Sequence, residues 1–168
     1  MGKPQGMDFL LETIRTNKND NAFFLIIGDG TEFNMVDKWF VEYRPRNATL
    51  LRKLPKTDYD TLLASCDVGL IFLNKNFLIP NFPSRLLSYL EMKMPVIAAT
   101  DPNTDIGDVI EAAQCGYKVI AGDIDDMNYR IDLLANQNDL SSLQSNAWNL
   151  LNQEYLTERS YKLIIGKL

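Results

Sequence analysis

Short apolar runs alternate along the chain with longer stretches in which apolar residues recur at helical spacing. The runs favour five β-strands, at residues 22–27, 48–51, 68–73, 95–99 and 117–120. The other stretches favour helices at residues 8–17, 31–43, 57–63, 84–92 and 104–114. From about residue 125 the pattern is helical to the end, with breaks near 136–139 and 152–157. Thr57 and Ser84 are the predicted N-caps of their helices.

This alternation predicts an α/β fold with a doubly wound, Rossmann-like parallel sheet. Parallel neighbouring strands need crossover connections, and right-handed crossovers place helices on both faces of the sheet. Residues 22–27 are apolar throughout and end at Gly28, which is typical of a strand buried on both faces. The length of 168 residues suits one domain, and we treat residues 1–168 as a single unit.

Ligands of such sheets bind beyond the carboxyl ends of the strands. The loops at those ends are residues 28–31, 52–57, 74–85 and 99–105, and we expect them to lie along one edge of the domain.

The chain starts unusually for this architecture. Residues 1–6 lead directly into a helix, whereas a doubly wound sheet begins with a central strand. We interpret the chain as a fragment of a larger protein that lacks its first strand and everything upstream of it. A strand from a tag or from a partner could fill the gap.

The amino-acid composition excludes several kinds of catalytic and metal-binding site. With no histidine in the chain, a Ser-His-Asp triad, a Cys-His pair and a His-ligated metal are excluded. The net charge of −5 argues against nucleic acid as a partner. Cys66 and Cys115 lack metal-ligand spacing and are interpreted as buried, reduced residues of a cytoplasmic protein. No apolar run approaches the roughly 20 residues that span a bilayer.

The segment at residues 81–100 carries the most chemical information. In it, Pro83, Ser84 and Arg85 open a helix, where free amides, a hydroxyl and a guanidinium would together favour a phosphate or diphosphate. An ordinary N-cap beside a solvated arginine explains the same residues equally well.

The whole chain, moreover, resembles the C-terminal, donor-binding domain of family-4 glycosyltransferases of the GT-B fold, as found in bacterial surface-polysaccharide synthesis. Residues 2–6 resemble the glycine-rich turn of that family, and residues 24–30 its strand ending in Gly-Asp-Gly. Residues 58–71 resemble its unit ending Cys-Asp-Val-Gly-Leu-Ile, and residues 84–98 its donor-site helix followed by Pro-Val-Ile-Ala. The four matches occur in the same order as in the family.

The resemblance implies a site for a nucleoside-diphosphate sugar, which is a substrate, so that neither a cofactor nor a metal is expected. The resemblance also implies which residues contact each part of this substrate. Those expected at the diphosphate are Ser84, Arg85, Gly2 and Gln5, and the catalytic cations are Arg85 and Lys3. Those expected at the sugar are Asn81, Phe82 and Pro83. Those expected at the base and ribose are Arg52, Lys53, Leu54, Ser88 and Glu91.

The chain also departs from the family pattern. At the two positions where the family usually has glutamates, this chain has Pro80 and Ser88. Where the family has a basic residue in its glycine-rich turn, this chain has Gln5. Glu91 lies three residues beyond the ribose position.

The resemblance also implies transfer with retention of configuration. The acceptor, a glycan or a lipid-linked molecule, would be held by an absent N-terminal domain, so this fragment alone would be inactive. The full protein would then work in the cytoplasm, with peripheral contact at the inner face of the membrane.

Other features of the sequence suggest other functions. Gly28 and Gly30 suggest dinucleotide binding, but Phe33 replaces the third glycine of that motif. A non-catalytic α/β module, either a degenerate transferase domain or a receiver-like domain with Asp29 as phosphoacceptor, is the main alternative, although no acidic pair accompanies Asp29. The acidic residues 123–126 fit a helix start better than a metal site, and Asp101 fits a turn.

Overall fold

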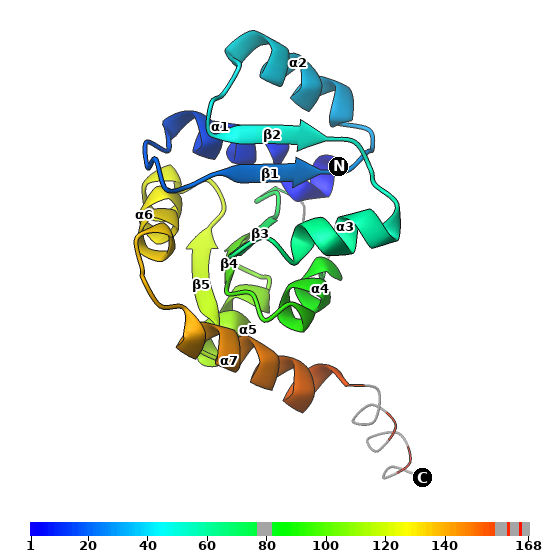
Figure 1. The fold of residues 1–168 in the computed structure, drawn as a ribbon, viewed down its shortest axis with the longest axis vertical. Coiled ribbons are helices and arrows are strands. Elements are labelled where there is room, and N and C mark those ends of the chain that lie inside the picture. The colour runs from blue at the N-terminus through cyan, green and yellow to red at the C-terminus, as the bar shows by residue number, and fades with distance from the viewer. Residues whose placement is uncertain (77–81, 157–160, 162–164, 166–168) are drawn as a thin grey trace.

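The computed structural model describes residues 1–76, 82–156, 161 and 165, and short parallel strands alternate with helices along them (Figure 1). The strands are β1 (Phe24–Ile27), β2 (Ala48–Leu51), β3 (Gly69–Phe72), β4 (Val96–Thr100) and β5 (Gly116–Ile120). The α-helices are α1 (Met7–Thr16), α2 (Phe33–Tyr43), α3 (Lys56–Leu63), α4 (Arg85–Glu91), α5 (Ile106–Ala112), α6 (Ile124–Ala135) and α7 (Ser141–Leu150). A short 3-10 helix, η1 (Lys3–Gln5), precedes α1, and a π-helical turn, η2 (Leu151–Tyr155), follows α7.

The five predicted strands are confirmed, and all five run parallel to their neighbours. The predicted break near residues 136–139 separates α6 from α7. The second predicted break differs, because residues 151–155 continue as η2, while residues 157–160 lie outside the described part. Thr57 is not an N-cap: Pro55 holds that position in extended backbone, and Thr57 lies inside α3.

The strands form two sheets rather than one. Within the described residues, β1 pairs with β2 in a two-stranded sheet, and β3, β4 and β5 form a three-stranded sheet in that order. Figure 1 shows β1 and β2 lying above β3, with the amino end of the chain beside the arrowhead of β1. The sheet predicted as continuous is therefore divided between β1 and β3.

Helices cover both faces, as predicted for a doubly wound fold. On one face α1 packs on α6, and α6 contacts β4 and β5. On the other face α5 covers β4 and β5, and α4 contacts both β3 and α7. Helix α1 turns Met7, Leu10, Leu11 and Ile14 into the core, a spacing that produces one apolar stripe. No helix of the described part is long and apolar enough to cross a membrane.

Strand β4 is the best-protected strand. It pairs with β3 on one side and β5 on the other, and each of its five residues is buried. Two hydrophobic clusters meet on it: Ile97 and Ala99 belong to the cluster around α1 and α6, whereas Val96 and Ala98 belong to the cluster around α4, α5 and α7. This alternation follows from the two-residue period of side chains in a strand.

Candidate functional site

The carboxyl ends of β1, β2 and β3 are tied together by short contacts. The Gly28 amide donates to the Leu51 carbonyl at 3.1 Å, and the Met1 amino group donates to the Asp29 carbonyl. Asn74, just beyond β3, donates its amide to the Pro4 carbonyl at 2.9 Å. The predicted convergence of the loops after β1, β2 and β3 is therefore present, and the first five residues of the chain bridge it.

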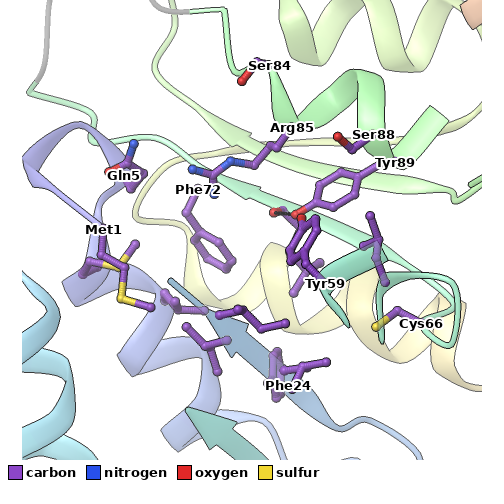
Figure 2. Close-up of a pocket in the computed structure, with 17 residues that line it drawn as sticks. Met1, Gln5, Phe24, Tyr59, Cys66, Phe72, Ser84, Arg85, Ser88 and Tyr89 are labelled. Atoms are coloured by element: carbon purple, nitrogen blue, oxygen red, sulfur yellow. Dashed lines mark hydrogen bonds between the residues drawn. The ribbon is translucent and has the colours of Figure 1, made fainter. Parts of the chain in front are cut away.

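A cavity of about 460 Å³ opens between the two sheets. Gln5 provides polar lining on one side. On the other side, polar lining comes from Ser84, just before α4, and from Arg85 and Ser88 in α4 (Figure 2). Its apolar lining comes from the four residues of β1, from β3, and from helices α1 and α3. Among the described residues that line it, none is an Asp, Glu, Lys or His. The described lining therefore offers one positively charged side chain and several hydrogen-bond donors, a combination suited to binding an anion.

Arg85 supplies that charge. It is the first residue of α4, it is half-buried, and Figure 2 shows its guanidinium extending towards Gln5. Among the described residues, no carboxylate forms a salt bridge with it. An arginine that is half-buried and unneutralised retains its donors for a ligand, since the guanidinium stays charged at any ordinary pH.

Ser84 and Ser88 accompany Arg85 in the lining. Ser84 occupies the predicted N-cap position, which is confirmed, but its hydroxyl caps no amide of the helix. Ser88 lies one turn further along the helix and also faces the cavity. Glu91, at the end of α4, is exposed and does not line the cavity. Of the two residues on this helix that were expected near the ribose, Ser88 lines the cavity with Arg85 and Glu91 does not.

The turn at the start of the chain contributes through Gln5. The Gly2 amide donates to Gln5 Oε1 at 2.7 Å, so this amide is already used within η1. Among the described residues, the Gln5 side-chain nitrogen donates no hydrogen bond, and Gln5 borders the cavity. Lys3 is exposed and lies outside the lining, with only its carbonyl engaged, by Asn74 Nδ2 at 3.1 Å. Gln5 therefore lines the same cavity as Arg85, whereas Lys3 does not.

Arg52 belongs to a different part of the edge. Its Nη1 lies 3.4 Å from Asp29 Oδ1, and its guanidinium sits 4.3 Å from the centre of the Phe33 ring. Arg52 and Lys53 are exposed and Leu54 is half-buried, and none of the three lines the cavity. Their predicted contact with a nucleobase remains a prediction.

The predicted sugar-binding residues are only partly described. Asn81 lies outside the described residues. Phe82 is 46% exposed and packs on Tyr155, with ring centres 5.8 Å apart, so it faces the C-terminal part of the chain. Pro83 is buried, and its carbonyl accepts the Leu86 amide at 3.0 Å. Neither Phe82 nor Pro83 lines the cavity.

Two tyrosines line the cavity that the sequence did not single out. Tyr59 comes from α3 and Tyr89 from α4 (Figure 2). The Tyr89 hydroxyl donates to the Leu70 carbonyl at 3.1 Å, and burial raises the pKa of Tyr89 to about 12. Their place in the cavity lining depends on how α3 and α4 pack in space, which the sequence does not give.

The acidic candidates are explained by local structure. Asp123 caps α6 by accepting the Asp126 amide at 3.0 Å, as predicted for a helix start. Asp101 accepts the Thr104 hydroxyl at 2.5 Å and the Asn103 amide at 2.8 Å, which makes it a turn residue. In the part of the chain that is described, no three His, Cys, Asp or Glu side chains gather as a metal site.

The glycines after β1 act in the turn itself. Gly30 has a φ of 138°, and a Cβ on it would lie 2.0 Å from the Met1 carbonyl oxygen. A side chain is therefore excluded there by both backbone conformation and space. Asp29, the residue considered as a phosphoacceptor, faces Arg52 rather than another acid.

Both cysteines are free, as predicted. Cys115 is fully buried, and burial raises the pKa of its thiol to about 11. Cys66 differs from the prediction in being only half-buried, because it lies in the cavity lining. Burial raises the pKa of the Cys66 thiol as well.

Known proteins resemble this chain in sequence and in structure. The chain is 28% identical over 155 residues to the probable glycosyltransferase WbjE of Pseudomonas aeruginosa, covering 92% of this chain and 38% of that protein. The structure resembles TarM of S. aureus, solved with UDP, at a TM-score of 0.78 and 21% identity, covering 99% of this chain and 33% of TarM. It also resembles HepE of Anabaena, solved with UDP-glucose, at a TM-score of 0.78 and 14% identity, covering all of this chain and 47% of HepE.

This chain thus spans less than half the length of each of these proteins. The two solved structures support the α/β fold with parallel sheets between helices. Residues 1–149 match the family described as glycosyl transferases group 1. The chain therefore belongs to the group 1 glycosyl transferases.

Proposed function

We propose that this chain is the donor-binding domain of a two-domain glycosyltransferase and that it binds a nucleoside-diphosphate sugar at the carboxyl edge of its strands. One observation carries the proposal: the Arg85 guanidinium, which no described carboxylate neutralises, borders a cavity together with two serines and Gln5. Family membership makes a diphosphate the natural ligand of that charge. UDP is the first nucleotide to test, because TarM and HepE were each solved with UDP or UDP-glucose.

In this proposal Arg85 has an electrostatic role. When the glycosidic bond of the donor breaks, negative charge builds up on the departing diphosphate. A guanidinium held beside the diphosphate oxygens stabilises this charge, and Ser84, Ser88 and Gln5 add hydrogen bonds to the diphosphate. The described residues of the cavity lining supply neither a carboxylate nor a histidine. Any proton transfer from the acceptor would therefore depend on groups outside the lining.

The finer features of the function are also proposals. We place the chain in the C-terminal half of a family-4, GT-B enzyme of bacterial surface-polysaccharide synthesis, acting without a metal and with retention of configuration. The acceptor, a glycan or a lipid-linked molecule, would be held by another domain at the cytoplasmic face of the membrane. This chain alone is then expected to bind a donor weakly and to transfer no sugar.

The affinity for UDP tests the role of Arg85. We expect Arg85→Gln to weaken UDP binding about tenfold or more, since a hydrogen bond to a charged group contributes about 1.5–3 kcal/mol. Isothermal titration of the purified chain measures the change. Arg46→Gln is the matched control, because Arg46 is an exposed arginine outside the cavity. Equal affinities of the two variants would contradict the proposed role.

A chain that binds neither UDP nor GDP nor their sugars would favour the other interpretation, a non-catalytic module that retains the fold. The replacements at Pro80 and Ser88 are the sequence features that keep this interpretation open.

A further inference from the structure

The short turn η1 carries Gln5 to the edge of the cavity, but it is a weak element by itself. It has three residues, and the Gln5 amide donates to the Gly2 carbonyl at 2.9 Å across it. Short 3-10 helices have poor hydrogen-bond geometry. Pro4, in the middle of the turn, has no amide to donate, so its carbonyl is its remaining backbone group for a hydrogen bond. The orientation of Gln5 therefore depends on contacts from outside the turn.

Asn74, two residues beyond β3, supplies such contacts. Its backbone amide donates to the Pro4 carbonyl at 2.9 Å, and its side-chain Nδ2 donates to the Lys3 carbonyl at 3.1 Å. Its Oδ1 accepts the Asn76 amide at 3.0 Å, which fixes the orientation of the side chain. Asn74 thus holds two consecutive carbonyls of η1, and both polar atoms of its side chain are used.

Gly6 lets the turn approach the end of β3 closely enough for these bonds. Its φ is 54°, and a Cβ on it would lie 3.1 Å from the Leu73 carbonyl oxygen and 3.3 Å from the Asn74 nitrogen. Glycine adopts this left-handed conformation readily and leaves room for the neighbouring backbone. The end of η1 therefore lies directly against the segment that carries Asn74.

The Gln5 side chain is oriented within the turn that Asn74 holds. Gln5 Oε1 accepts the Gly2 amide at 2.7 Å, which leaves the donor end of the side-chain amide available to the cavity. Figure 2 shows the Arg85 guanidinium extending towards Gln5. Asn74 is not among the described residues that line the cavity. We therefore expect any effect of Asn74 on a ligand in the cavity to act through η1.

We propose that Asn74 is a positioning residue of the donor site, which holds η1 so that the Gln5 amide meets the diphosphate bound at Arg85. This role rests on the proposed function, because the diphosphate is the ligand inferred there. Its physical basis is pre-organisation. A side chain that is already held in its binding orientation loses less conformational freedom when the ligand arrives, so the affinity for the ligand rises.

Hydrogen exchange in the ligand-free chain gives the first test. We expect Asn74→Ala to make the Gln5 amide exchange about tenfold faster, because η1 loses one of the bonds that hold it closed. Asn76→Ala is the matched control, since Asn76 is an exposed residue of the same loop whose backbone amide stays in place. The amides of Leu10 and Ile14 in α1 serve as references for the rest of the fold. Equal exchange at Gln5 in the two variants would overturn the proposal.

Asn74→Asp separates the bond to η1 from the turn at Asn76. Its carboxylate keeps an acceptor for the Asn76 amide but has no hydrogen to donate to the Lys3 carbonyl. We expect the Gln5 amide to exchange as fast in Asn74→Asp as in Asn74→Ala. Exchange as slow as in the unchanged chain would mean that the turn at Asn76, rather than the bond to Lys3, holds η1, and this result would contradict the proposal.

Titration with UDP tests the link to the ligand. We expect Asn74→Ala to weaken UDP binding about three- to tenfold, the range that corresponds to one hydrogen bond. Added to Gln5→Ala, the same substitution should cause no further loss, because Asn74 acts through Gln5. Asn76→Ala should bind UDP as the unchanged chain does. A loss that is the same with and without Gln5 would refute the positioning role.

Failure of this role and failure of the proposed function give different results. If the unchanged chain binds no nucleoside diphosphate, the proposed function fails and the role assigned to Asn74 fails with it. If the unchanged chain binds UDP and Asn74→Ala binds it equally well, the proposed function stands and the role of Asn74 alone is refuted.

Discussion

Asp101 shows how one side chain shapes the edge near the proposed donor site. It follows β4, is 6% exposed, and accepts hydrogen bonds from the Thr104 hydroxyl and the Asn103 amide. The Thr104 bond, followed by the backbone bonds, lowers the pKa of the Asp101 carboxyl below its ordinary 3.8. The ionised carboxylate therefore stabilises the folded turn.

The lowered pKa of Asp101 makes the free energy of unfolding depend on pH. A folded-state pKa below 3.8 means that the contribution is complete above about pH 4 and is lost as pH falls through the folded value. We expect Asp101→Asn to lower the free energy of unfolding at pH 7 by about 1 kcal/mol, the difference between charged and neutral hydrogen bonds. The gap should shrink as pH falls below 4. Urea unfolding at a series of pH values measures it, with the exposed Asp20→Asn as control.

At the scale of elements, the start of α6 gives the clearest test of a local sequence signal. Asp123 has extended backbone and accepts the Asp126 amide at 3.0 Å, whereas Asp125 is an exposed residue of the first turn. Asp123→Ala should therefore cost about 1 kcal/mol of stability, the usual value of an N-cap. Asp125→Ala should cost only a few tenths, through the helix dipole. Thermal unfolding compares them, and equal losses would contradict the capping role.

Local signals predicted some element boundaries and missed others. Residues 48–51 are β2 as predicted, since a short apolar run between polar segments allows little shift. Thr57 failed as an N-cap because Pro55 already provides an extended backbone and a fixed φ at the helix start. Ser84 holds the predicted position, yet its backbone is helical and its hydroxyl caps nothing. Residue type alone does not encode these backbone angles.

At the scale of the molecule, the alternating pattern predicted the parallel topology and the convergence of loops at the carboxyl edge. The presence of Arg85 and Ser88 in one cavity lining could be predicted because both lie on the helix of the recognised motif, and their roles toward a ligand remain proposals. Tyr59 and the salt bridge of Arg52 with Asp29 were not predictable, because both depend on how separate loops pack in space.

The net charge of −5 makes the location of positive charge important for the whole molecule. An anionic ligand gains no general attraction from such a protein, so its binding must depend on local cations. Arg85 is the cation that the cavity lining provides. Binding of UDP should consequently weaken as salt is raised, and less steeply in Arg85→Gln than in the unchanged chain. Titrations at low and high salt measure this, and identical salt dependence would argue against a charge contact at Arg85.

Mapping the amide chemical shifts of the isotope-labelled chain during titration with UDP and UDP-glucose tests the central claim most directly. The account predicts progressive shifts at Gln5 and at residues 84–88, with little change in α6. It is contradicted if no nucleotide shifts these amides, or if the shifts lie only in elements remote from the cavity.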